Sequence, residues 1–161
     1  MVKNYMIIRR FTENDAEKVS EMVIRTFKTS NSKDYSEEAI RALEKQTQPS
    51  DILERASWTH FYVVEDNDTI IGCGAIGPYW GSKTESSLFT IFVMPECQGK
   101  GIGRKIIETL EQDEYFHRAT RVEVPASITA VNFYRKLGYD YKNGVDRPDE
   151  EQIYRLEKFR N

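Results

Sequence analysis

The chain has 161 residues, 39% of them hydrophobic, and a net charge of −3. This length predicts one domain, residues 1–161, and the mild acidity excludes a global basic field for nucleic acid. No apolar run approaches the ~20 residues of a transmembrane helix, and residues 1–10 lack the apolar segment of a signal peptide. Cys73 and Cys97 form no C-x-x-C pair, so we expect free thiols in a cytoplasmic protein without a membrane partner.

The first part of the chain is expected to form a strand followed by helices. Apolar and β-branched residues predict a strand over residues 5–9, and a helix follows the cap residue Thr12. Ser36 opens a second helix, which Pro49 ends or soon follows. Residues 51–56 favour one further helical turn.

A hairpin is expected next. Residues 61–65 and 69–76 alternate in a strand-like pattern on either side of a polar turn. Gly72 and Gly74 in the second strand indicate a bulge or a close approach of another backbone. Residues 79–81, Tyr-Trp-Gly, then form an aromatic turn, for which packing is favoured over substrate contact.

The stretch from Leu88 to Leu110 joins a buried strand to a helix through a loop that breaks local rules. Gly101 and Gly103 lie in or before the first helical turn, where each glycine costs ~1 kcal/mol relative to alanine. Lys100 and Arg104 place positive charge at a helix N-terminus, which prefers negative charge. Free N–H groups beside cations predict a phosphate-binding loop.

Two common phosphate-binding motifs do not fit this loop. A Walker loop requires Ser or Thr after Gly-Lys, but Gly101 follows Gly99-Lys100, and residues 77–84 also have the wrong spacing. A dinucleotide fingerprint requires a third glycine at Arg104. The pattern that remains is Q-x-x-G-x-G, which begins at Gln98 after a strand ending V-x-P.

The last part of the chain is expected to alternate strand, helix, strand and strand. The predicted segments are a strand over 121–124 that Pro125 stops, a helix over 130–137, and strands over 139–142 and 152–158. The full order is β-α-α-β-β-β-α-β-α-β-β. It predicts an α/β fold with a mixed sheet of six to seven strands and helices on both faces.

The loop motif, its V-x-P entry and the later N-F-Y-R-K-L-G-Y at residues 132–139 together resemble the GNAT superfamily of N-acetyltransferases. The resemblance is sharpest over residues 88–139. It implies a mostly antiparallel GNAT-like sheet, acetyl-CoA as co-substrate, no metal and an amine acceptor. The segment between the first two strands would cover the sheet, shape the acceptor pocket, or do both. Many relatives are dimers, so a homodimer stays open.

The resemblance also implies cofactor-binding residues. Main-chain groups of Ile91, Phe92 and Val93 would pair with the pantetheine arm, and residues 98–104 would hold the pyrophosphate. Lys100 and Arg104 could instead be solvated. Ser127 stands where many members have Asn. The implied set is Ile91, Phe92, Val93, Gln98, Gly99, Lys100, Gly101, Ile102, Gly103, Arg104, Ser127 and Asn132.

Two residues are catalytic candidates, Tyr134 by the same resemblance and Glu85 by its place on the strand. Tyr134 would protonate the departing thiolate, since a phenol pKa near 10 suits that task; the alternative is a core tyrosine. Some members have a glutamate base where this chain has Ser87. Glu85 lies two residues earlier and could act through water, bind a cationic acceptor, or be a solvated strand residue. No general base is therefore fixed.

The predicted function is direct transfer of acetyl from acetyl-CoA to a primary amine of a small molecule. Glu85, Asp51 and Glu54, if near the pocket, would favour a small cationic amine. Two alternatives stay open: a non-catalytic acyl-CoA-binding or sensing module, and an acetyltransferase of protein N-termini or lysines.

Overall fold

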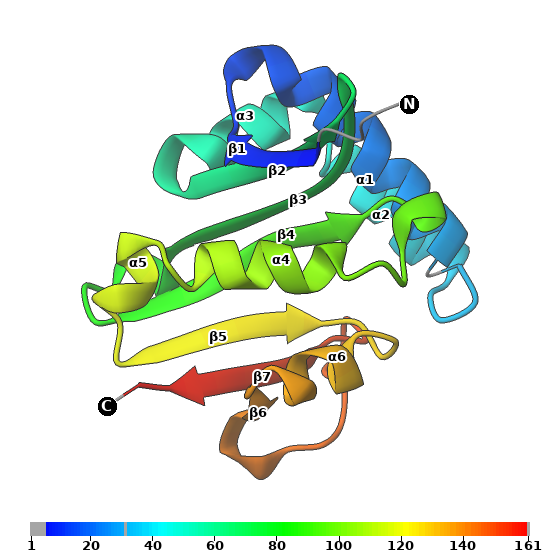
Figure 1. Ribbon diagram of the computed structural model, residues 1–161. Coiled ribbons are helices and arrows are strands. Elements are labelled where there is room, and N and C mark those ends of the chain that lie inside the picture. The colour runs from blue at the N-terminus through cyan, green and yellow to red at the C-terminus, as the bar shows by residue number, and fades with distance from the viewer. Residues whose placement is uncertain (1–5, 31, 161) are drawn as a thin grey trace.

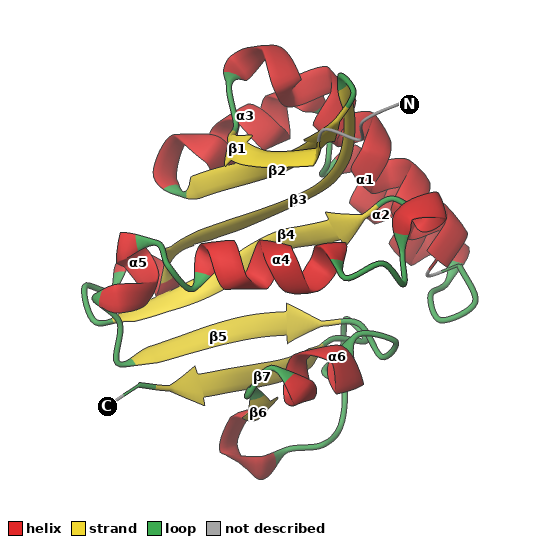
Figure 2. Cartoon of the chain, in the orientation of Figure 1, coloured by secondary structure: helices red, strands yellow, loops and turns green. Residues whose placement is uncertain are grey.

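The computed structural model describes residues 6–30 and 32–160, within which the chain forms one seven-stranded sheet, six α-helices and four short 3-10 helices (Figures 1 and 2). The strands are β1 (Met6–Arg10), β2 (His60–Asp66), β3 (Thr69–Pro78), β4 (Glu85–Val93), β5 (Arg121–Ala126), β6 (Asp140–Tyr141) and β7 (Tyr154–Phe159). The helices are α1 (Ala16–Ser30), α2 (Glu37–Lys45), α3 (Pro49–Trp58), α4 (Ile102–Leu110), α5 (Glu114–His117) and α6 (Val131–Lys136).

The strands lie in the order β1-β2-β3-β4-β5-β7-β6. β4 and β5 run parallel, and the remaining neighbours are antiparallel. The β2–β3 hairpin turns at Asn67 and Asp68, whose φ values of 49° and 70° match the primed turns that suit a twisted hairpin. The expected mixed, mostly antiparallel sheet is confirmed.

Helices cover both faces of the sheet, as expected. α4 packs on β3 and β4 with its apolar side, while α1 lies on the opposite face and contacts α3 (Figure 1). The α4 side of the core contains the four buried residues that recur at helical spacing, Ile102, Ile106, Ile107 and Leu110. Within the described ranges, no helix is long and apolar enough to cross a membrane.

Helix starts follow the sequence signals. Ser36 caps α2, and its side chain accepts a hydrogen bond from the Ala39 N–H at 3.1 Å. Pro49 soon follows the end of α2, which is one of the two expected alternatives, and it begins α3 at its first position, where the missing N–H has no helical partner anyway. The single turn expected over 51–56 is therefore a ten-residue helix.

The expectation that Pro125 stops its strand is wrong. β5 continues to Ala126, and Pro125 pairs with Arg155 of β7. Beyond Glu123, β5 is no longer paired with β4. A residue without an N–H is tolerated in a strand that has an unpaired edge. The strand over 139–142 shortens to two residues, and α5 was not expected.

Gly74 allows α4 to approach the sheet. A Cβ atom at this position would lie 2.6 Å from Cγ2 of Ile106 and 3.3 Å from Cδ1 of Leu110. Both alternatives expected from these glycines are found: the register with β4 shifts at Gly74, and a Cβ at Gly72 would lie 3.2 Å from the Phe92 carbonyl oxygen. The spacing between helix and sheet therefore depends on the missing side chain at Gly74.

We expect Gly74→Ala to lower the free energy of unfolding by about 1–3 kcal/mol, because it overpacks this contact. Denaturant unfolding measures the change. Ile106→Leu removes the clashing Cγ2 branch, so the double variant should be less destabilised than the sum of the single variants. Simple additivity would show that this contact does not set the helix–sheet distance.

Candidate active site

A gap opens in the sheet between β4 and β5. The two strands pair only where Glu85–Ser87 lie beside Arg121–Glu123. Beyond these residues β4 stays paired with β3, and β5 with β7, so their facing edges lack a partner strand. Main-chain polar groups require hydrogen-bond partners. This edge can therefore bind an extended ligand through main-chain hydrogen bonds.

β4 carries a bulge inside this gap. Gly74 of β3 lies opposite two residues of β4, Thr90 and Ile91. Thr90 has a φ of 52°, which costs about 1–3 kcal/mol in a β-branched residue. The Cys73 thiol donates a hydrogen bond to the Thr90 carbonyl at 3.1 Å. Strained backbone of this kind concentrates at functional sites, so the bulge marks the gap as a site.

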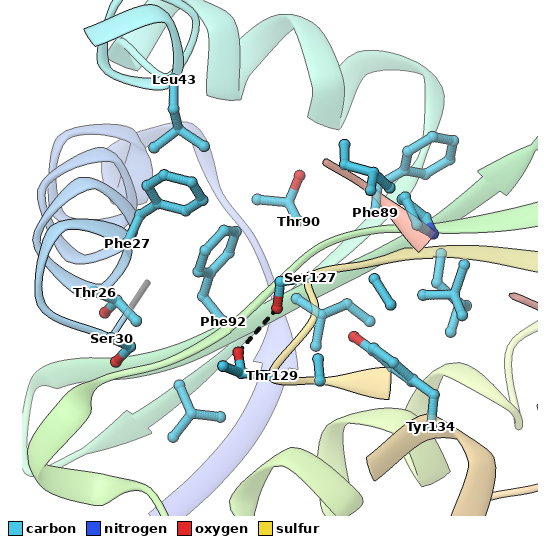
Figure 3. Close-up of a pocket in the computed structure, with 18 of the residues that line it drawn as sticks. Thr26, Phe27, Ser30, Leu43, Phe89, Thr90, Phe92, Ser127, Thr129 and Tyr134 are labelled. Atoms are coloured by element: carbon cyan, nitrogen blue, oxygen red, sulfur yellow. Dashed lines mark hydrogen bonds between the residues drawn. The ribbon is translucent and has the colours of Figure 1, made fainter. Parts of the chain in front are cut away.

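Two cavities meet at the gap. The reaction cavity, about 620 Å³, is bounded by α1, β4, β5 and Tyr134 (Figure 3). The loop cavity, about 430 Å³, lies beside residues 97–104 and α6. Their walls have five residues in common, Ile91, Val93, Gln98, Ala130 and Tyr134. A ligand in the loop cavity can thus meet a second ligand in the reaction cavity.

The glycine loop presents free main-chain donors to the loop cavity. Among the described residues, none accepts a hydrogen bond from the backbone N–H groups of residues 99–104. Gly99 and Gly101 have φ values of 77° and 81°, and a Cβ at either position would meet no atom within 4 Å. Ile102, whose side chain is buried in the core, begins α4 directly after Gly101. The loop and the helix N-terminus fit an anionic group such as a phosphate.

The cations and the third glycine of the motif have different surroundings. Lys100 is exposed and forms no ion pair with a described residue, whereas Arg104 is exposed and pairs with Glu108 at 3.1 Å. Gly103 has a packing role, because a Cβ there would lie 3.2 Å from the Phe133 ring. Of these three glycines, only Gly99 and Gly101 have the positive φ values that favour glycine.

Gln98 links three segments. Its side-chain Nε2 donates hydrogen bonds to the Val93 carbonyl at 2.9 Å and to the Ser30 hydroxyl at 3.0 Å. The amide therefore joins the end of β4 and the end of α1 to the glycine loop. The Val93 carbonyl, which belongs to the strand edge expected to pair with the pantetheine arm, therefore already accepts a hydrogen bond from Gln98.

Tyr134 lies where the two cavities join. Its side chain is 4% exposed, and its ring points from α6 into the reaction cavity (Figure 3). The hydroxyl has no hydrogen-bond partner among the described residues. Burial raises the pKa of this phenol well above its ordinary value of 10. Tyr134 therefore stays protonated at neutral pH and can donate a hydrogen bond into the cavity.

The two other cofactor candidates lie apart. Ser127 lines the reaction cavity and lies 3.2 Å from the Thr129 hydroxyl (Figure 3). Asn132 is exposed and lines a separate hollow beside Arg135 and Gly138. The structure brings Ser127, but not Asn132, to the joined cavities.

A carboxylate lies beside Ser87, but on the neighbouring strand. Ser87 pairs in register with Glu123 of β5, which is 3% exposed. One Glu123 oxygen accepts hydrogen bonds from Arg121 at 2.9 and 3.0 Å. Glu85 also binds Arg121, and it lines neither of the two joined cavities. Sequence reasoning missed Glu123, because its distance from Ser87 along the chain hides the strand pairing.

The residues 57–141 match the acetyltransferase (GNAT) domain family. The match covers more than half of the chain, and it includes the bulged strand, the glycine loop and Tyr134. The chain belongs to the GNAT family of acetyltransferases.

An uncharacterized N-acetyltransferase of Methanocaldococcus jannaschii is 29% identical over 83% of this chain and 78% of its own. The PaiA N-acetyltransferase of Thermoplasma acidophilum, solved with coenzyme A, matches 97% of this chain and 99% of its own with a TM-score of 0.81 and 18% identity. A GCN5-related N-acetyltransferase of Rhodopseudomonas palustris matches 99% of this chain and 98% of its own, with a TM-score of 0.77 and 20% identity. These two structures share the fold.

We expect native protein to take up one maleimide, at Cys97. Cys97 is partly exposed and lines the loop cavity. Cys73 is fully buried, and burial raises the pKa of its thiol to about 12, so little reactive thiolate forms near neutral pH. Mass spectrometry should show the second label only after unfolding, and Cys97→Ser should leave native protein unlabelled. Labelling of native Cys73 would contradict the described packing.

Proposed function

We propose that residues 1–161 form one N-acetyltransferase domain that transfers acetyl directly from acetyl-CoA to a primary amine of a small molecule. The observation that carries this proposal is the row of free N–H groups at residues 99–104 next to the open edge of β4. The PaiA structure contains coenzyme A and has the same fold, which supports acetyl-CoA as the co-substrate.

In this proposal main-chain groups hold most of the co-substrate. The N–H groups of Gly99, Gly101 and their neighbours bind the pyrophosphate, and Lys100 and Arg104 add positive charge. Arg104 would exchange its exposed pair with Glu108, which is weak in water. The edge at Ile91–Val93 pairs with the pantetheine arm, and a main-chain N–H near Phe92 or Val93 stabilises the oxyanion.

Tyr134 would act on the departing sulfur. Its raised pKa makes it a weaker acid than an exposed tyrosine, whereas a thiol has a pKa near 8.5. Full proton transfer from the phenol to the thiolate would therefore be uphill. We infer that Tyr134 donates a hydrogen bond to the sulfur as the C–S bond breaks, while the attacking amine supplies the proton that forms the free thiol.

The remaining candidates receive secondary roles. Ser127 would contact the co-substrate through its hydroxyl. Asn132 would contact only the end of the co-substrate that extends beyond the two joined cavities. Glu85 would act through water, because Arg121 occupies one of its carboxylate oxygens.

A protein N-terminus or a lysine as acceptor, and a non-catalytic sensor of acyl-CoA, remain the alternatives. Turnover with a free amine separates them from the proposal.

We expect Gly101→Glu to abolish acetyl-CoA binding, because a carboxylate would enter the phosphate site in a strained conformation. Gly144→Glu is the matched control: its φ of 71° and open surroundings give similar strain away from both cavities. Calorimetric titration with acetyl-CoA, beside ATP and NAD, measures the effect. Equal affinity of both variants for acetyl-CoA would contradict the site.

We expect Tyr134→Phe to lower kcat about 10- to 100-fold, since a hydrogen bond to a charged group contributes about 1.5–3 kcal/mol, while acetyl-CoA affinity changes little. Tyr139→Phe serves as the control: it removes a hydroxyl bonded to Glu111 from the same aromatic cluster. Steady-state kinetics measures kcat, and calorimetry measures the affinity for acetyl-CoA. A wild-type rate in Tyr134→Phe would leave Tyr134 with packing alone.

A further inference from the structure

The acceptor side of the gap, by which we mean the reaction cavity and a side cavity next to it, contains one positive charge that has no ion-pair partner among the described residues. Beside the reaction cavity lies a side cavity of about 480 Å³, and both are lined by Phe89 and Pro125. Three charged residues line the side cavity: Arg55, Glu123 and Arg155. No charged residue lines the reaction cavity within the described part of the chain. The charge balance of the acceptor side therefore depends on these three residues.

Two of the three are already neutralised. Glu123 accepts hydrogen bonds from Arg121 and from Lys142, each at 2.9 Å. Arg155 donates to Asp149 at 3.0 and 3.1 Å. Arg55 forms no ion pair with any described residue. Among the described residues that line these two cavities, Arg55 is thus the one charged side chain without an ion-pair partner, and its charge is positive.

Arg55 stacks on two aromatic rings but is poorly hydrogen-bonded. Its guanidinium lies over the Phe89 ring at 4.6 Å and the Trp58 ring at 5.5 Å. Its one hydrogen bond with a described residue is a long one, from Nη1 to Thr90 Oγ1 at 3.4 Å, and its buried Nε has no partner. Burial lowers the pKa of this group. Stacking offsets part of this cost, but a desolvated guanidinium without an anion remains unfavourable.

We propose that Arg55 binds a carboxylate of the acceptor, which is then a small amino acid or a close analogue. The planar fork of arginine matches a carboxylate. Arg55 touches Thr90, and Thr90 and Tyr134 line the same reaction cavity, so one small molecule could place its carboxylate at Arg55 and its amine in that cavity. This inference rests on the acetyl transfer proposed above.

The aromatic residues at the rim suit the rest of such a molecule. Trp80 is 90% exposed and has a φ of 47°, and Trp58 lies beside Arg55; both line the side cavity. A strained, exposed tryptophan at a cavity mouth offers apolar surface to a side chain. A diamine would instead place its second ammonium next to Arg55, where like charges repel.

The sequence-based expectation of a small cationic acceptor loses its support here. Asp51 accepts a hydrogen bond from the Gln48 N–H at 2.9 Å and caps α3. Glu54 is exposed, and Glu85 is bound to Arg121. None of these three carboxylates lines the reaction cavity or the side cavity.

The first test compares amino acids with their decarboxylated amines, using thiol release from acetyl-CoA. The pairs are phenylalanine with phenethylamine, leucine with isoamylamine, and lysine with cadaverine. The readout is the ratio of kcat/KM within a pair, compared between wild type and variants, so intrinsic differences in amine pKa cancel. Arg55→Met should lower the ratio about 10- to 100-fold.

Arg55→Lys keeps the charge without the fork, so it should retain part of the preference. Arg41→Met is the matched control, because Arg41 is an exposed arginine of α2 that pairs with Glu37; its ratio should equal that of wild type. An unchanged ratio in Arg55→Met, even with lowered stability, would leave Arg55 as a packing residue and overturn the proposal.

A second readout does not depend on turnover. In Trp80→Phe, Trp58 is the one remaining tryptophan of the chain. Phenylacetate and isocaproate should change its fluorescence saturably, their neutral amides should not, and Arg55→Met should remove the response. No saturable response to either carboxylate would overturn the proposal. If acetyl-CoA fails to bind in calorimetry, the acetyl transfer fails, while this carboxylate titration still decides the role of Arg55.

Discussion

The parallel pairing of β4 with β5 ends after three residues, and the site depends on where it ends. Up to Ser87 and Glu123 the two backbones satisfy each other. Beyond them the ladder does not continue: β4 has a bulge at Thr90, and Pro125 of β5 has no N–H to donate. The open edge, the two joined cavities and the position of Tyr134 all follow from this interruption.

Two kinds of recognition meet at the opening. On the loop side, main-chain N–H groups at residues 99–104 face a cavity, and the side chains of Ile102 and its neighbours remain available for the core. On the other side, the walls are side chains from α1, α2 and α3 and from the turn at residues 79–81. A main-chain site tolerates sequence change, whereas a side-chain site changes its ligand with each substitution. The family can therefore be assigned from a motif, while the acceptor cannot.

The sequence predicts those features that local rules determine. The glycine loop after β4, the α4 stripe and the Ser36 cap depend on residues a few positions apart, and the structure confirms them. Residues brought together by the sheet were not predictable. Glu123 reaches Ser87 only through strand register, and Arg55 of α3 meets Phe89 of β4 through the packing of two elements that are distant in sequence. The αL conformation of Thr90 has no sequence signal, since threonine is a good strand residue.

The gap between β4 and β5 also separates the strands of the first part of the chain from those of the last part. Each strand from β1 to β4 pairs with the next strand along the chain, and β5, β7 and β6 pair among themselves. Arg121 bridges the two parts near the paired end through Glu85 of β4, while its ion pairs with Glu123 and Glu157 stay within the second part. Between these two parts of the sheet, the described strands pair only through the three-residue β4–β5 ladder. The opening therefore lies along the boundary between two parts that are each fully paired within themselves.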